Sequence, residues 1–358
     1  MSAQSSTPTD TVPAIHAQGV TRAFNGGVRA LDGIDVTIPA GELVALIGAN
    51  GSGKSTLLKI FFGVLAADAG TVRVLGLYPR NDRERLSALV GYAGQDIALD
   101  PEITGYETLR LFYALRGLPP AERGQRIRDL VEEYDLADFY ERRAGTYSGG
   151  QRQRLHLAIE TMHEPRLLML DEPTASLDPE GRRRLWERLA AWRDGGRTVV
   201  VATHDLPDIA SRCNRVLLLR GGRLLASGAP GALVAAHGRA RAVITLERPM
   251  EQGIGRLRTE LAALPGALDV AIGERTITVW RDHHPDGPEP ALDALSARGI
   301  HYQRYERLEP DLAEAYFRLT GSTLDGDAQP RPGRRGSGGG MGGGGGMGGG
   351  RGTGGRRA

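Results

Sequence analysis

The sequence predicts an α/β protein whose main sheet is parallel and covered by helices on both faces. The first observation is an apolar run at 43–47, followed by a glycine-rich stretch and then by helical spacing over 54–63. The second is that three further apolar runs, 167–170, 198–202 and 216–219, alternate with helical segments. Strands that alternate with helices in this way indicate parallel β-α-β units.

The other elements of this first domain follow from local patterns of apolar and turn residues. We expect further strands and helices, the strands at 14–24, 34–47, 71–75 and 88–93 and the helices at 104–116, 120–134, 150–163 and 181–192. Two strands joined by Gly221 and Gly222 read as a hairpin that closes the domain near residue 235. The domain therefore spans 14–235, with a mainly helical subdomain at about 95–163.

The pattern changes from residue 240, where a second and smaller α+β domain is expected to run to residue 320. Its expected strands are 242–247, 268–272, 276–281 and 302–307, and its expected helices are 250–264, 290–298 and 310–320. The order β-α-β-β-α-β would suit a small ferredoxin-like fold. The N-terminus, 1–13, is expected to be flexible, and the Gly/Arg-rich tail, 321–358, to be disordered.

Composition and charge restrict the classes of function. No stretch approaches the ~18–20 consecutive apolar residues that a membrane-spanning helix needs, and no secretory signal pattern is present. The lone Cys213 excludes an internal disulfide and is typical of a reducing compartment. The chain carries a net charge of +2, and six of its arginines lie beyond residue 330, so residues 1–330 carry −4. We therefore expect a soluble, intracellular protein that does not bind nucleic acid.

Residues 48–56 read Gly-Ala-Asn-Gly-Ser-Gly-Lys-Ser-Thr and match the pattern G-x-x-x-x-G-K-[ST]. The glycines let backbone N–H groups turn toward phosphates, and the following helix directs its positive dipole end at them. Lys54 would reach the β- and γ-phosphates, and the Ser55 hydroxyl would bind Mg²⁺. The pattern in this strand–loop–helix context predicts ATP binding by Gly48, Asn50, Gly51, Gly53, Lys54, Ser55 and Thr56.

A second motif places two acids directly after the buried run 167–170. Ligands of open α/β sheets bind at the carboxyl ends of the strands, which is where Asp171 and Glu172 stand. We expect Asp171 to hold Mg²⁺ directly or through water. Glu172 would polarise the water that attacks the γ-phosphate. In other proteins two acids at the end of a strand often belong to a helix cap or a solvated turn. The presence of the phosphate loop in the same chain argues against that interpretation here.

A third motif, Ser148-Gly149-Gly150-Gln151 after Tyr147, opens another helix and forms a second anion site that the phosphate loop does not explain. Here the sequence resembles the ATP-binding cassette family, whose signature reads Leu-Ser-Gly-Gly-Gln. Four of the five positions match, and Tyr147 replaces the usual leucine.

Four further residues stand where the family places functional ones. Gln95, in Gly94-Gln95-Asp96, matches the glutamine that senses Mg²⁺ and the membrane partner. Asp178 matches the aspartate that communicates across the dimer, and His204 matches the switch histidine at the γ-phosphate. Phe24 occupies the position of the aromatic residue that stacks on adenine. Singly, each of these would pass as an ordinary loop or core residue, but together they follow the family order over residues 15–230.

The resemblance implies a mechanism and partners. Two cassettes, here expected to be two copies of this chain, close head-to-tail over two ATP molecules. Each ATP would lie between the 48–56 loop of one subunit and residues 148–151 of the other. Glu172 and His204 would act in hydrolysis. Because half of each site would come from the second subunit, a lone monomer should bind ATP and turn it over poorly.

The resemblance also favours transport over the other roles of the family. Cassette proteins of DNA repair and chromosome structure carry a long coiled coil between the phosphate loop and the signature, and only 94 positions separate Lys54 from Ser148 here. Ribosome-associated members carry two cassettes, and this chain has one set of motifs. We therefore expect the permease to be a separate chain and the ATPase to lie peripherally on the cytoplasmic face of the cell membrane.

Two weaker motifs suggest the branch of transporters. The segments 100–109 and 308–321 resemble those of ATPases for drug resistance and for lipid or polysaccharide export. The alternatives are an importer ATPase, a subunit of a metal- or cofactor-related transporter, and a cassette ATPase without a transport role. In such transporters the membrane partner contacts the cargo, so the sequence of this chain does not identify the substrate.

Overall fold

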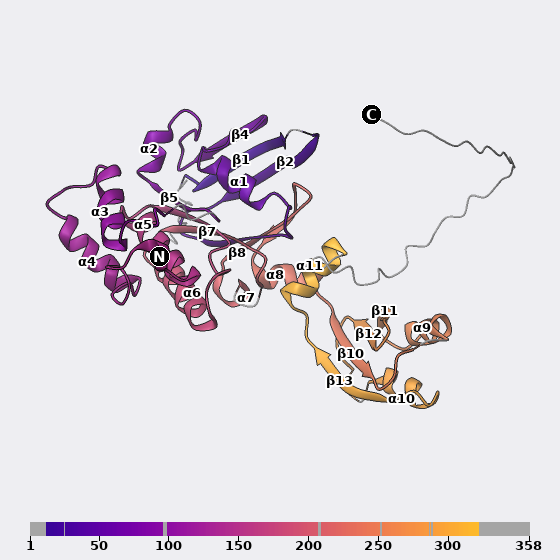
Figure 1. Ribbon diagram of the computed structural model, residues 1–358. Coiled ribbons are helices and arrows are strands. Elements are labelled where there is room, and N and C mark those ends of the chain that lie inside the picture. The colour runs from indigo at the N-terminus through magenta and orange to yellow at the C-terminus, as the bar shows by residue number, and fades with distance from the viewer. Residues whose placement is uncertain are drawn as a thin grey trace, which may run out of the picture.

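The computed structural model describes residues 12–321, except 25, 96–98, 207–208, 251–252, 286 and 288. The expected flexible N-terminus and disordered tail therefore lie outside the described residues, except for positions 12, 13 and 321. Asp96 of the glutamine motif also lies outside them. Figure 1 shows a main body, which holds the elements from β1 to α8, and an accessory body, which holds those from β10 to β13. None of the described helices is long and apolar enough to cross a membrane.

A six-stranded sheet forms the centre of the main body. In spatial order its strands are β5 (Val90–Ala93), β6 (Leu167–Asp171), β7 (Thr198–Thr203), β3 (Leu43–Ile47), β8 (Arg215–Arg220) and β9 (Arg223–Gly228). All neighbours are parallel except β8 and β9, which form the predicted antiparallel hairpin. The α/β class predicted from the alternation of apolar runs and helices is confirmed.

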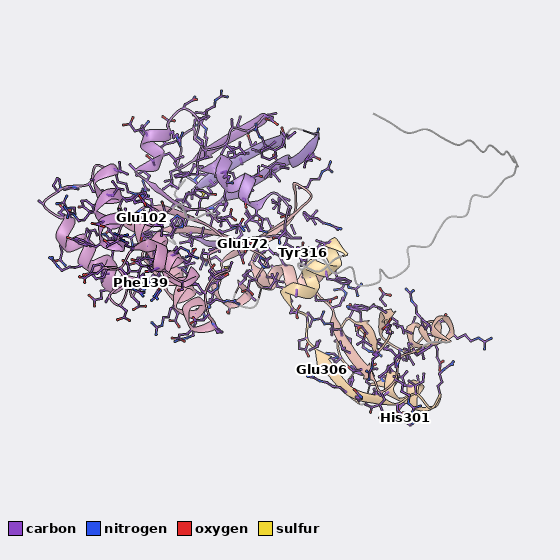
Figure 2. All side chains as sticks on the ribbon, viewed as in Figure 1. Glu102, Phe139, Glu172, His301, Glu306 and Tyr316 are labelled. Atoms are coloured by element: carbon purple, nitrogen blue, oxygen red, sulfur yellow. The ribbon has the colours of Figure 1, made fainter. Side chains whose placement is uncertain are left out.

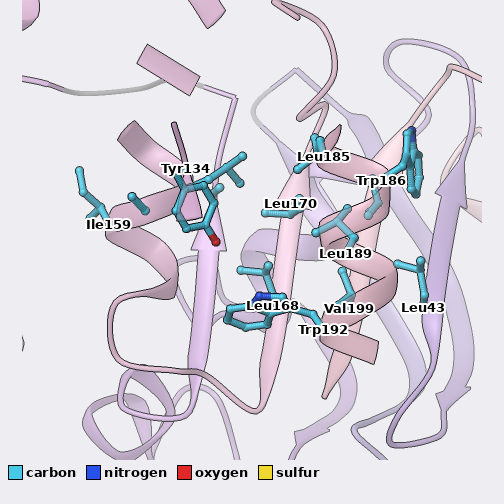
Figure 3. Packing of buried hydrophobic residues seen from close by; sticks show 14 of the residues in the cluster. Leu43, Tyr134, Ile159, Leu168, Leu170, Leu185, Trp186, Leu189, Trp192 and Val199 are labelled. Atoms are coloured by element: carbon cyan, nitrogen blue, oxygen red, sulfur yellow. The ribbon is translucent and has the colours of Figure 1, made fainter. Parts of the chain in front are cut away.

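Helices cover both faces of this sheet because its central strands are apolar on both sides. Along β3, Leu43 and Ile47 belong to one buried cluster, whereas Val44 and Leu46 belong to another. The first cluster contains Leu185, Leu189 and Trp192 of α6 (Pro179–Asp194), the face predicted from the sequence, and Figure 3 shows these side chains beside Leu168 and Leu170 of β6. The second contains Leu57 and Leu58 of α1 (Lys54–Phe61).

A separate antiparallel sheet, in the order β2-β1-β4, is a feature that the sequence reading missed. It consists of β1 (Ile15–Phe24), β2 (Val28–Ile38) and β4 (Ala69–Val74). The single strand expected at 34–47 was wrong, because the chain turns between β2 and β3. Pro39 has no N–H to donate to a sheet, and Gly41 adopts φ 76°, a conformation that suits glycine.

The predicted helical subdomain contains α3 (Gly105–Leu115), α4 (Arg123–Glu133) and α5 (Gly149–Thr161). A capping box begins α3, since the Thr104 side chain accepts a hydrogen bond from the backbone N–H of Glu107 and the Glu107 carboxylate accepts one from Thr104. Among the described residues, three α-helices outside this subdomain were not expected. Two of them, α2 (Arg83–Ser87) and α7 (Ile209–Arg212), are too short for a periodic pattern to reveal, and the third is α8 (Pro230–His237).

The accessory body holds a four-stranded antiparallel sheet in the order β11-β12-β10-β13. Its elements are β10 (Ala240–Leu246), α9 (Ile254–Ala262), β11 (Ala267–Ile272), β12 (Thr276–Arg281), α10 (Pro290–Ser296) and β13 (Tyr302–Leu308). This sheet and its helices share a buried cluster of their own. The last helix, α11 (Leu312–Thr320), instead packs against α8, and its Leu312 and Tyr316 belong to the core of the main body.

Candidate functional site

The phosphate loop connects β3 to α1 and depends on its glycines. Gly53 adopts φ 107° directly before α1, and a Cβ atom there would lie 2.5 Å from the carbonyl oxygen of Ala30. A Cβ atom at Gly48 would collide with the carbonyl oxygen of Leu219 on β8. Side chains at these positions would push the loop away from the sheet. The glycines therefore keep the backbone close to β8 and leave the N-terminus of α1 open to a ligand.

Lys54 is almost fully buried and joins the loop to the end of β6. Its Nζ donates a hydrogen bond of 2.7 Å to the carbonyl oxygen of Gly48 and lies 3.3 Å from Oε1 of Glu172. The other carboxylate oxygen of Glu172 accepts a hydrogen bond of 3.0 Å from Nδ1 of His204. The backbone of Glu172 has φ 51°, which is costly for a residue with a side chain and is typical of functional sites. Three residues predicted from separate motifs therefore form one connected group.

Asp171, the neighbouring acid, is buried, and neither of its carboxylate oxygens has a hydrogen-bond partner. Burial raises the pKa of this carboxyl, and the negative charge of Glu172 adds to the rise; Ser55 and Lys54 oppose it. A buried carboxylate without partners is costly unless a cation compensates for it. Carboxylate and hydroxyl oxygens are the ligands that Mg²⁺ prefers, so the residues present fit such an ion.

Most of the predicted nucleotide-binding residues line one cavity of about 390 Å³. Its lining consists of Ala30, Asn50, Gly51, Ser52, Gly53, Lys54, Ser55, Thr56, Gln95 and Glu172. Ala30 and Ser52 were not singled out from the sequence. Phe24, the last residue of β1, does not line this cavity and is 44% exposed. The guanidinium of Arg22 lies 5.2 Å from the centre of its ring.

The signature residues line a different cavity, of about 430 Å³, together with Asp178. Ser148 begins α5 with a capping box, since its hydroxyl accepts a hydrogen bond of 3.2 Å from the backbone N–H of Gln151. Asp178 begins α6 in a similar way by accepting from the N–H of Gly181. Within one chain, therefore, the phosphate loop and the signature open into separate cavities.

Tyr147, the departure from the family signature, is buried and fully hydrogen-bonded. Its hydroxyl donates to the carbonyl oxygen of Phe139 at 2.9 Å and accepts from the backbone N–H of Gly105 at 3.1 Å. Its ring packs edge-on against Phe139. The ring therefore fills the apolar position of the usual leucine, and the hydrogen bonds of the hydroxyl offset the cost of its burial.

Two contacts of the site escaped the sequence reading. Tyr316 of α11 accepts a hydrogen bond of 3.3 Å from the backbone N–H of Ala49 in the phosphate loop. Arg182 of α6 pairs with Asp205, which follows His204, at 2.5 Å. Neither contact has a local signal, because the partners lie far apart in the sequence and meet only through packing.

Comparisons with known proteins point to the same family as the motifs of this site. A family model described as ABC transporter matches residues 31–175. The daunorubicin/doxorubicin resistance ATP-binding protein DrrA of Streptomyces peucetius is 32% identical over 322 residues, which cover 87% of this chain and 94% of that protein. The Nod factor export ATP-binding protein I of Paraburkholderia xenovorans (strain LB400) is 36% identical over 312 residues, with 87% and 98% covered.

Solved structures give the same result for the fold. The dimeric structure of a post-hydrolysis state of the ATP-binding cassette MJ0796, bound to ADP and Pi, matches with a TM-score of 0.55 and 26% identity, over 60% of this chain and 98% of that one. The structure of an ATP binding subunit of an ABC transporter matches with a TM-score of 0.57 and 27% identity, over 62% and 91%. The chain belongs to the ATP-binding cassette family and is an ATP-binding ATPase.

Proposed function

We propose that this chain is the ATP-hydrolysing subunit of an exporter whose membrane permease is a separate chain, with a cargo of the drug, lipid or polysaccharide type. The observation that carries the proposal is the extent of the similarity. Relatives named for drug resistance and for Nod factor export match over 87% of this chain, well beyond the family model. The permease would hold the ATPase at the cytoplasmic face of the membrane.

In the proposed chemistry the phosphate loop and Lys54 bind the β- and γ-phosphates of ATP. Glu172 polarises the attacking water, and the bond from His204 orients its carboxylate. Phe24 stacks on the adenine. Ser55, Gln95 and Asp171 would hold Mg²⁺, which supplies positive charge to the phosphates. The protein's remaining contribution to the rate of hydrolysis is that it holds these groups in position.

The proposed active form is a dimer of this chain. Because residues 148–151 and the phosphate loop open into separate cavities, one chain does not bring both to the same γ-phosphate. In a head-to-tail pair related by a two-fold axis, the phosphate loop of each subunit would face residues 148–151 of the other, which makes two complete sites. In this arrangement Asp178 lies near the junction of the two subunits. We further propose that residues 14–235 form the ATP-binding domain and that 240–320 form a small accessory domain. Its ferredoxin-like part is 240–308, and its last helix, α11, packs on the main body.

Subunit complementation tests the shared site. A Lys54→Ala chain has a defective phosphate loop, and a Ser148→Arg chain has a blocked signature, so each homodimer should be inactive. A mixed dimer keeps one intact site, so an equal mixture should recover about a quarter of the wild-type activity. Failure to recover activity in mixed dimers that are shown to form would exclude a shared site.

Vesicle transport tests the exporter assignment. The chain is expressed with its native membrane neighbours, and the membrane protein that co-purifies with it is reconstituted. In inside-out vesicles, ATP added outside should drive cargo into the lumen, and the Glu172→Gln variant should not support this movement. Cargo that moves only in the opposite sense would identify an importer.

A further inference from the structure

Helix α11 lies between the two bodies and contacts both. On one side Leu312 and Tyr316 complete the core of the main body. On the other side, Glu314 pairs with Arg241 of β10 at 2.7 Å, and Phe317 stacks on Trp280 of β12 with ring centres 6.4 Å apart. In Figure 2 the Tyr316 label marks α11 where the two bodies meet. The helix therefore connects the accessory sheet to the core of the main body.

The hydroxyl group of Tyr316 connects α11 to the phosphate loop. Tyr316 is 1% exposed, and its hydroxyl oxygen accepts a hydrogen bond of 3.3 Å from the N–H of Ala49. The end of the same helix is held by Arg220 of β8, whose guanidinium donates to the carbonyl oxygen of Thr320. Ala49 follows Gly48, the residue at which the chain leaves β3 and enters the loop. The bond therefore restrains the loop at its entrance.

We propose that Tyr316 is a positioning residue for the phosphate loop and that it couples the accessory sheet to ATP binding. The inference rests on the binding of ATP by this loop. A loop whose N–H groups are already directed toward phosphate loses less conformational freedom when ATP binds. Any shift of α11 that breaks the contact therefore weakens binding. By linkage, ATP in turn stabilises the docked position of α11.

The Tyr316→Phe variant tests the proposal because it keeps the buried ring and removes only the hydroxyl. We expect the dissociation constant for ATP to rise roughly three- to tenfold, from the loss of one hydrogen bond. The value of kcat at saturating ATP should change much less, because the hydroxyl does not touch the reacting atoms. Tyr134→Phe is the matched control, since Tyr134 is equally buried and its hydroxyl accepts a 2.8 Å bond from Thr161 in the helical subdomain.

A double-mutant cycle separates positioning from general loosening of the core. Ala49→Pro removes the N–H donor, so it should weaken ATP binding to a similar extent as Tyr316→Phe. The double variant should be no weaker than either single one. Additive losses, equal losses in Tyr134→Phe, or an unchanged dissociation constant in Tyr316→Phe would overturn the proposal.

Hydrogen exchange tests the reverse direction of the coupling. ATP should slow amide exchange in α11 of the wild type and have a smaller effect on α11 in Tyr316→Phe. Equal protection in both proteins would contradict the coupling. A separate measurement tests whether the loop binds ATP at all: the wild type should bind ATP, and Lys54→Ala should abolish this binding. If that result holds and the Tyr316→Phe variant behaves like the wild type, only the inference about Tyr316 fails, and the proposed function stands.

Discussion

The ammonium of Lys54 lies 3.3 Å from a carboxylate oxygen of Glu172, so the proposed phosphate ligand and the proposed water-polarising acid form an ion pair. Both side chains are at least nine-tenths buried. Ion pairs of this kind interact strongly, because little solvent screens them. The γ-phosphate of ATP carries more negative charge than one carboxylate and competes for the same ammonium. We therefore expect the binding of ATP to release Glu172 from Lys54 and leave its carboxylate free to contact water.

This relationship gives the first prediction, for Glu172→Gln. Glutamine keeps the size of the side chain but is neutral, so it neither polarises water well nor holds Lys54. We expect kcat to fall by at least about 100-fold, ATP to bind more tightly, and an ATP-bound dimer to accumulate. Phosphate release and size-exclusion chromatography with ATP measure these effects. Glu132→Gln, an exposed position on α4, serves as the control. A variant that hydrolyses ATP at a near-normal rate would remove Glu172 from this role.

The second prediction compares the only two lysines of the chain. Lys54→Ala removes the ammonium expected to contact the phosphates, and we expect ATP affinity to fall by at least about tenfold, since charged hydrogen bonds to phosphate are strong. Lys59 lies on the same helix but is exposed, so Lys59→Ala should bind ATP normally. Fluorescent nucleotide titration measures both. Equal affinities in the two variants would contradict the assigned role of Lys54.

The third prediction is that Asp171→Asn raises the stability of the protein and lowers its activity. Because burial raises the pKa of Asp171, the charged carboxylate destabilises the native state at pH values above that pKa. The neutral amide removes this cost, so the melting temperature of the nucleotide-free protein should rise at neutral pH. Magnesium-dependent hydrolysis should fall by at least about 100-fold. Thermal unfolding without nucleotide and phosphate release with Mg²⁺ provide the two readouts. A lowered melting temperature would refute the argument from burial.

Two buried histidines predict a loss of stability in acid. Burial, with the positive charge of Arg116 as a second cause, lowers the pKa of both His156 and His163 to about 4. An unfolded histidine binds its proton near pH 6.5, so between pH 6.5 and about 4 the unfolded state holds more protons. The free energy of unfolding is therefore full above this window and falls as the pH decreases through it.

Denaturant unfolding at a series of pH values across this window measures the effect. A variant with His156 and His163 replaced by glutamine should lose less stability in acid than the wild type. Parallel pH profiles for the two proteins would show that these histidines are not the cause.

Several parts of the fold and the site were predictable because their signals are local. The apolar runs around Leu43 and Leu168 indicate strands buried on both faces. The spacing of Leu185, Leu189 and Trp192 indicates one face of a helix. The residues of the phosphate loop lie within nine consecutive positions, 48–56, so the whole motif is visible in the local sequence.

Other features were not predictable, because they depend on which segments meet. The strand break is an exception, because Pro39 and Gly41 are local turn signals that the prediction of a single strand overlooked. The antiparallel sheet of β1, β2 and β4 was missed because local patterns do not identify strand partners. The bond between Tyr316 and Ala49 joins residues 267 positions apart, and nothing near Tyr316 marks it as a partner of the loop.

By itself, then, the sequence determined the identity and order of the motifs, the parallel sheet and the family. Tertiary structure alone decided that Lys54, Glu172 and His204 form one group, joined by an ion pair and a hydrogen bond. It also decided that the signature opens into a different cavity and that α11 docks on the loop. The physical reason is range: helix and strand periods and turn residues act over a few positions. Ion pairs and docking contacts instead depend on how distant surfaces fit together and exclude water.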